Sequence, residues 1–157
     1  MAVNITYEDH AVIFPSRLIA SERGAHIFNV TVNTDCDNGK IVSLGDHVKN
    51  DNFDEKQYSG AFAGKIVQDS QRPDFYFVFV EEPGDAILLY KEPVIEYEFN
   101  KTIKDFHRYY NAAGDVCKGY QLMKYDMWEV SKEGFVGDPE VGKSVSVDAA
   151  TGKLKVA

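Results

Sequence analysis

Apolar and polar residues alternate along several short segments of the chain. In 28–32 and 95–99, large apolar side chains occupy every second position and polar ones lie between them, and 144–147 repeats the pattern with serine and valine. A period of two sends successive side chains to opposite faces of an extended strand. Each segment is therefore predicted to be a half-buried β-strand.

A fourth segment, 75–80, is apolar at every position and consists of aromatic and valine residues. Prolines flank it on both sides, at Pro73 and Pro83. Aromatic and β-branched residues suit strands, and a strand with two apolar faces is covered on both. The pattern predicts a central strand or a strand at an interface.

Turn-forming residues separate these segments, for example Asp37-Asn38-Gly39 and Thr151-Gly152. Short strands between frequent turns predict a mainly β fold, a small antiparallel β-barrel or sandwich. At the C-terminus, Leu154 and Val156 are expected to pair back onto 144–147 as a hairpin. One short helix is predicted over 100–111, where Asn100 can cap it and Ile103, Phe106 and Tyr110 recur at helical spacing.

Two polar or irregular stretches are expected to lie outside the core. Residues 1–23 show no sustained period and are interpreted as an extended N-terminal arm or edge element, leaving 24–157 as a single β-rich domain. The polar stretch 49–57 is predicted to be a surface loop. The arm is expected to contact a neighbouring molecule. The candidate interface residues are Val12, Ile13, Phe14, Arg17, Trp128 and Phe135, although a core position is the simpler interpretation of Trp128.

Composition narrows the possible partners. The 157 residues carry a formal charge of −8, which repels a phosphate backbone and argues against nucleic acid. No apolar run approaches the roughly 18 residues that span a bilayer, so no membrane partner is expected. The first residues lack a basic segment followed by an apolar one, so we expect synthesis in a cytoplasm. Cys36 and Cys117 are accordingly predicted to be free thiols.

Two segments match motifs with chemical meaning, and each has a plainer interpretation. Residues 137–144 satisfy G-x-x-x-x-G-K-[ST], but strand periodicity follows where a phosphate loop needs a helix. Asp35 to Ile41 resembles a calcium loop, yet its glycine comes one position early, and a tight turn explains it. The histidines are scattered singly. We therefore predict no catalytic, cofactor or metal site.

Turn glycines and strand patterns recur in several segments over roughly residues 25–157. The segments are 39–46, Gly60 with 64–67, 110–115, 118–122, 126–131 and 135–154. Together they resemble the capsid decoration (cement or head-auxiliary) proteins of tailed bacteriophages, although they hold no catalytic signature.

The resemblance implies an all-β, non-enzymatic virion protein on the outer surface of the capsid, with the major capsid protein as its partner. Such proteins often sit around local three-fold axes, so self-association, including a trimer, is expected. Two other classes stay open. Exposed aromatic side chains on a β surface would suit a carbohydrate-binding or adhesion module, and a small enzyme remains the third possibility because a fold does not dictate function.

Overall fold

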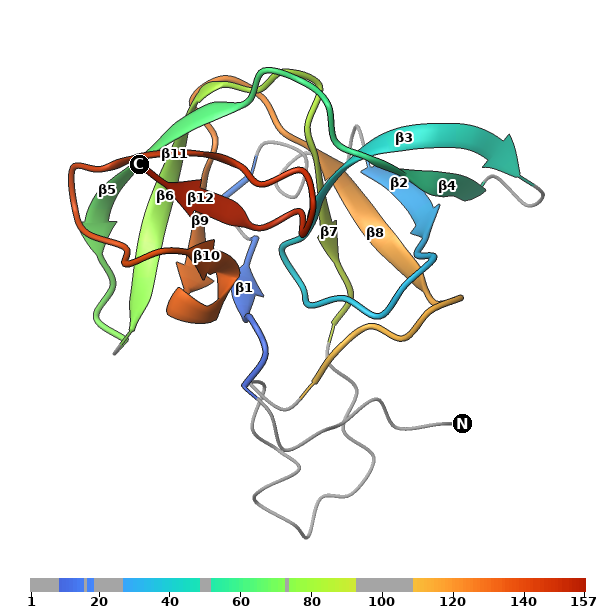
Figure 1. Cartoon of the computed structure of the whole chain (residues 1–157), viewed down its shortest axis with the longest axis horizontal. Helices are drawn as coiled ribbons and strands as arrows, with labels where there is room; N and C mark the ends of the chain where they lie inside the picture. The colour runs from blue at the N-terminus through green and yellow to red at the C-terminus, as the bar shows by residue number, and fades with distance from the viewer. Residues whose placement is uncertain (1–8, 16, 19–26, 49–51, 73, 93–108) are drawn as a thin grey trace, which may run out of the picture.

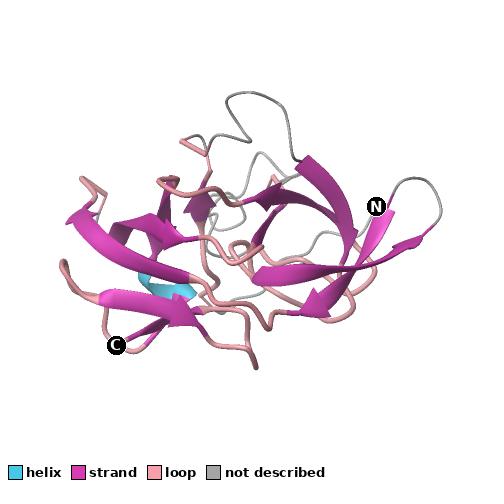
Figure 2. Cartoon of the chain, turned by 90° about the horizontal axis from the view of Figure 1, so that it is seen from above, coloured by secondary structure: helices cyan, strands magenta, loops and turns pink. Residues whose placement is uncertain are grey.

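Two β-sheets account for the strands of the computed structural model, in which residues 9–15, 17–18, 27–48, 52–72, 74–92 and 109–157 are described. In these residues there are twelve strands and one turn of 3-10 helix at Lys132–Gly134 (Figure 1). The two sheets lie side by side, as the view from above shows (Figure 2). None of the described helical residues forms a segment long and apolar enough to cross a membrane.

The first sheet closes into a barrel in the order β2-β4-β3-β7-β8. All its strand pairs are antiparallel except β2 with β4, which run parallel. Valines, Ile87, Leu89 and Cys117 fill its interior. The strands are β2 (Ile27–Thr31), β3 (Ile41–Val48), β4 (Asn52–Gln57), β7 (Ile87–Tyr90) and β8 (Val116–Gln121).

The second sheet has seven strands in the order β1-β9-β6-β5-β11-β12-β10. Its interior strand β6 pairs with β5 on one side and β9 on the other. The strands are β1 (Ile13–Phe14), β5 (Ala63–Asp69), β6 (Phe75–Glu82), β9 (Met127–Ser131), β10 (Phe135–Val136), β11 (Ser144–Val147) and β12 (Leu154–Val156).

Strand β7 contributes side chains to the cores of both sheets. Ile87 and Leu89 point into the barrel, whereas Leu88 between them belongs to a larger cluster with Trp128 and Val78 of the second sheet. Because successive side chains of a strand leave on opposite faces, β7 contributes to both cores. The outer side of β7, which is part of the barrel wall, therefore packs against the second sheet.

The predicted β-rich class is confirmed, as are the strands at 28–32, 75–80 and 144–147. Strand β6 lies inside its sheet, and β11 pairs with β12 as the expected C-terminal hairpin. The predicted strand 95–99 and most of the predicted helix lie outside the described residues. At the helix's C-terminal end the prediction is wrong, because Asn111 makes a β-bridge with Cys36.

The predicted loop 49–57 is also wrong for its described part, because Asn52–Gln57 is strand β4. This strand lies between β2 and β3, and neighbours on both sides supply its backbone hydrogen bonds. Pairing of this kind overrides a polar composition. A strand that keeps much of its side-chain surface in solvent does not need an apolar pattern.

The described part of the N-terminal stretch, residues 9–15 and 17–18, includes a strand at a sheet edge, and it is not separate from the core. Strand β1 pairs with β9 at the edge of the second sheet. Ile13 and Leu18, at 1% and 0% exposure, lie in the larger hydrophobic cluster. A strand of two residues is too short to show a period in the sequence. Its burial is therefore decided by the sheet with which it pairs.

Candidate functional site

Strand β6 directs its two apolar faces to different surroundings. Val78 and Val80 are fully buried in the larger core, and Tyr76 packs against it. The alternation of a strand sends Phe75, Phe77 and Phe79 to the opposite side of the sheet. Phe77 and Phe79 are only half-buried there. The sequence 75–80 is therefore apolar throughout because one face builds the core and the other builds a surface.

Neighbouring strands add apolar side chains to that surface. Phe14 of β1 packs against Phe75 with ring centroids 5.8 Å apart, and Tyr125 packs against Phe79 at the same separation. Met127 of β9 lies opposite Phe79 in the strand register. We call this set the outer aromatic face. It consists of the apolar side chains of Phe14, Phe75, Phe77, Phe79, Tyr125 and Met127, together with the cations over their rings, Arg17, Arg72 and Lys124.

A cation lies over three rings of the outer aromatic face. The Arg72 guanidinium carbon is 4.2 Å from the centroid of Phe14, and that of Arg17 is 5.0 Å from the centroid of Phe77. The Lys124 ammonium lies 5.3 Å from the ring of Tyr125. A cation over a ring is attracted by the ring's quadrupole. Each contact therefore holds a charge at the surface beside an apolar group.

Glu129 fixes Arg72 in this arrangement. Its carboxylate, in a residue that is only 7% exposed, accepts a hydrogen bond from the Ser70 hydroxyl and one of 3.0 Å from Arg72. A buried carboxylate needs such partners because leaving water is costly for a charge. Together with Arg17 and Phe77, Arg72 and Glu129 line a hollow of about 410 Å³.

Tyr125 is the most exposed large apolar side chain of the described residues, at 67%. Its backbone φ is +75°, in the left-handed region that non-glycine residues rarely adopt. The turn is held in place by hydrogen bonds: the Tyr125 N–H donates to the carbonyl of Val80 at 2.9 Å, and the Met123 N–H donates to the Asp126 carboxylate at 2.8 Å. These bonds hold a strained, exposed tyrosine next to Phe79.

Four of the six candidate interface residues are buried in the core. Val12, Ile13, Trp128 and Phe135 are between 1% and 7% exposed and are core residues, so their side chains are not surface contacts. Trp128 thus follows the simpler of its two interpretations. Phe14 and Arg17 do belong to the outer aromatic face. Tyr125 and Arg72 were missed, and no local pattern marks them. Phe77 lies in the segment 75–80, whose two apolar faces predicted a central strand or a strand at an interface.

A second hollow, of about 430 Å³, lies between the β2–β3 connection and the C-terminal hairpin. On its wall, His10 Nδ1 lies 2.6 Å from the Asp37 carboxylate, which also accepts the Ala11 N–H at 3.0 Å. Burial raises the pKa of the Cys36 thiol in this hollow to about 12. A thiol that stays protonated is a weak nucleophile. The hydrogen bonds of Asp37 to His10 and to the Ala11 N–H join the N-terminal stretch to the β2–β3 connection.

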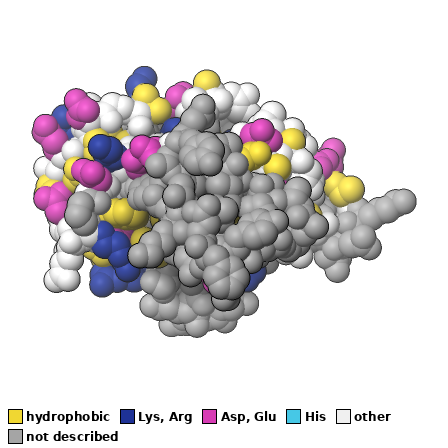
Figure 3. All heavy atoms as spheres, turned by 90° about the horizontal axis from the view of Figure 1, so that it is seen from below, with side chains coloured by type: hydrophobic (Ala, Val, Ile, Leu, Met, Phe, Trp, Pro, Cys, Tyr) yellow, Lys and Arg dark blue, Asp and Glu magenta, His cyan; other side chains and the backbone are white. Residues whose placement is uncertain are grey.

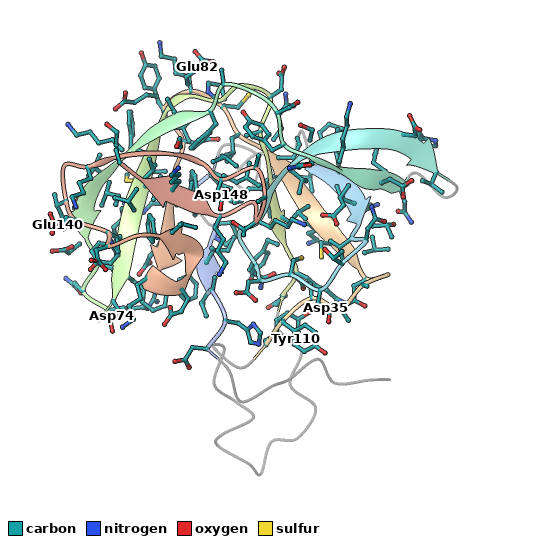
Figure 4. All side chains as sticks on the ribbon, viewed as in Figure 1. Asp35, Asp74, Glu82, Tyr110, Glu140 and Asp148 are labelled. Carbon is teal, nitrogen blue, oxygen red and sulfur yellow. The ribbon has the colours of Figure 1, made fainter. Side chains whose placement is uncertain are left out.

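The calcium-like segment is a tight turn. Asp35 accepts the backbone N–H of Ala113 at 2.9 Å, and Gly39 adopts a φ of +92° between β2 and β3. Strands flank the segment on both sides, as the turn interpretation requires. Among the described residues, no group of three or more potential ligands from His, Cys, Asp and Glu comes together. Among the labelled acidic side chains, Glu82 lies at the top of the view, Asp74 and Glu140 at its left side and Asp148 near its centre (Figure 4).

The phosphate-loop motif at 137–144 has no helix after it. Ser144 begins strand β11, and Gly142 lies in a turn with a φ of +94°. The Lys143 ammonium points to Glu140, 3.4 Å away, in an exposed pair. A phosphate loop depends on the amides of a helix N-terminus, so the strand removes the basis of nucleotide binding at this motif.

Comparison of the chain with protein-family models, with curated proteins and with solved structures found no match in any of the three.

Proposed function

We propose that this chain is a structural virion protein that binds the outer surface of a phage capsid and stabilises its lattice of capsomers. The single observation that carries the proposal is the outer aromatic face. It is the outer surface of the second sheet, on which aromatic, methionine and arginine side chains stay partly in solvent. The partner on this reading is the major capsid protein.

The composition of the outer aromatic face supports binding to protein. Aromatic residues, methionine and arginine are the types enriched at protein–protein interfaces, and lysine and acidic residues are the types depleted from interface centres. Tyrosine and arginine also dominate among residues whose truncation costs most binding energy. A face with Phe77, Phe79, Tyr125, Met127 and Arg17 has this composition.

The net charge supports an outer position. A protein of charge −8 is repelled by packed DNA and gains nothing from the interior of a filled shell. On the outside, it stabilises the shell by mass action, because a ligand that binds only the expanded lattice lowers the free energy of that state. Each tenfold excess of free protein over its dissociation constant contributes about 1.4 kcal/mol per site.

Co-sedimentation tests the proposal. The full chain is mixed with purified expanded shells from its own source and, in parallel, with unexpanded procapsids. We expect saturable binding to the expanded shells and a higher temperature of shell disruption once they are covered. The absence of binding to both kinds of shell would overturn the proposal, as would turnover of a substrate by the free protein. Sedimentation of the free protein tests the further expectation of self-association as a trimer.

One observation favours a second candidate, a carbohydrate-binding module. The Tyr125 ring is 67% exposed and lies beside Phe79, and flat exposed rings stack on sugars. A glycan array probed with the labelled protein distinguishes the two. Binding to a defined glycan that is lost in Tyr125→Ala would favour this candidate over the capsid.

A further inference from the structure

We infer that the outer aromatic face docks on a protein surface that presents carboxylates, with Tyr125 as the anchoring side chain. The inference rests on the proposed function and deepens it, since it names the contact face and the chemistry of the capsid surface that receives it. Two independent features carry it: the local charge of the face and the backbone conformation of Tyr125.

The face is cationic on an acidic molecule. Arg17, Arg72 and Lys124 lie over its rings, and Lys65 lies opposite Phe79 in the register of β5 and β6. Its carboxylates are Glu129, already bonded to Arg72, Asp69 at the rim of the hollow, and the exposed Glu81, which follows Phe79 at the strand's period of two. Four cations therefore meet three carboxylates here, while the whole chain carries −8. Viewed from below, the side of the molecule where β5 and β6 lie carries Lys and Arg side chains mixed with Asp and Glu side chains (Figure 3).

This charge pattern selects the partner. Guanidinium groups bind carboxylates through two parallel N–H donors, so Arg17 and Arg72 fit carboxylates on an apposed surface. Beyond the screening length of about 8 Å the distant acidic groups hardly act, so the cations of the face decide what binds there. Phosphates would meet the same cations at short range, and a DNA oligonucleotide is therefore one arm of the test below.

In its own chain the Tyr125 side chain contacts the Phe79 ring and the Lys124 ammonium, while its backbone is strained. Its φ of +75° is one that glycine or asparagine adopts at lower cost, and most of its side chain is in solvent. Strained, exposed residues persist where the strain serves a function. A rigid aromatic group held out from the surface is the kind of side chain that fills a pocket on a partner.

Two sets of variants test the inference, with binding to expanded shells as the readout. Arg17→Glu with Lys124→Glu reverses two charges on the face. Its matched control, Lys56→Glu with Lys118→Glu, makes the same change in net charge at exposed positions on barrel strands. We expect the first pair to weaken binding at least tenfold and to flatten its salt dependence, and the control to change affinity less than twofold.

Tyr125→Asn separates the anchor from the fold. We expect its thermal midpoint to stay level or to rise by roughly 2–4 °C, because asparagine tolerates positive φ, while shell binding falls at least tenfold. A Tyr125→Asn variant that is at least as stable as the parent and binds shells less tightly would show that Tyr125 serves binding and not the stability of the fold.

The outcomes separate this inference from the proposed function. If the unaltered chain fails to bind expanded shells, the proposed function fails. If it binds and both Tyr125→Asn and the Arg17/Lys124 pair bind equally well, the contact face is wrong and the proposed function stands. Tight binding of a DNA oligonucleotide that is lost in the Arg17/Lys124 pair would also overturn the inference, because the cations would then serve a nucleic acid.

Discussion

At the scale of single residues, a few buried polar side chains hold together segments that are far apart in the sequence. The side chain of Asn38, a residue at 4% exposure, pairs with the backbone of Lys91 as a neighbouring strand would. Its amide donates to the Lys91 carbonyl at 2.9 Å, and its oxygen accepts the Lys91 N–H at 3.0 Å. The same oxygen accepts a hydrogen bond from the Asn111 amide. One side chain thus joins the β2–β3 connection to the end of β7 and to residue 111.

We predict that Asn38→Ala lowers the free energy of unfolding by about 2–4 kcal/mol, because it leaves buried backbone and amide groups without partners. Urea unfolding followed by tryptophan fluorescence measures the change. Asn29→Ala, an exposed position on β2, is the control and is expected to stay within about 0.5 kcal/mol of the parent. Equal effects of the two substitutions would refute the bridging role of Asn38.

At the scale of elements, the C-terminal hairpin contacts the barrel through its turn. Gly152 adopts a φ of +72°, and its carbonyl accepts the N–H of Ile41 at the start of β3. A β-carbon at this position would lie 2.5 Å from Lys40 Cγ and 3.1 Å from the carbonyl oxygen of Ile41. The hairpin was predictable from alternation alone, but this contact was not, because it joins residues more than a hundred positions apart.

Gly152→Ala is expected to destabilise the protein by about 2–4 kcal/mol, through both the left-handed backbone and the lack of space. Gly114→Ala is the matched comparison, since Gly114 has a φ of +91° with nothing within 4 Å of the added carbon. It should cost about 1 kcal/mol. Thermal and urea unfolding of both variants measure the difference, and equal losses would show that the contact with β3 adds nothing.

At the scale of the whole molecule, the core links its stability to alkaline pH. Burial raises the pKa of both thiols, Cys36 and Cys117, from 9.0 to about 12. Burial also raises the pKa of Tyr58 and Tyr90 above the ordinary value. In the unfolded chain these groups release their protons at lower pH than in the folded one. The folded state therefore binds more protons over that range, and stability must fall as pH rises.

We predict that the thiols do not change the free energy of unfolding below pH 9. Between pH 9 and about 12 they decrease it progressively. Urea midpoints measured at intervals from pH 7 to 11 follow this change. The double variant Cys36→Ser, Cys117→Val should show a shallower fall, with the remaining slope owed to the tyrosines. If the parent and the double variant show the same slope, the thiols are not the buried groups that titrate.

The sequence by itself determined the β class, the strands at 28–32, 75–80 and 144–147, and the C-terminal hairpin, because alternation is a local property that each segment carries alone. Tertiary structure decided what each face of those strands meets. Strand β4 formed despite its polar composition because β2 and β3 flank it. Ile13 became a core residue because β1 pairs with β9, and Trp128, on β9 itself, because that strand pairs with β6. The outer aromatic face likewise exists only once β1, β6 and β9 lie side by side. Its rings and cations come from segments distant in the sequence, and no local pattern records which of them meet.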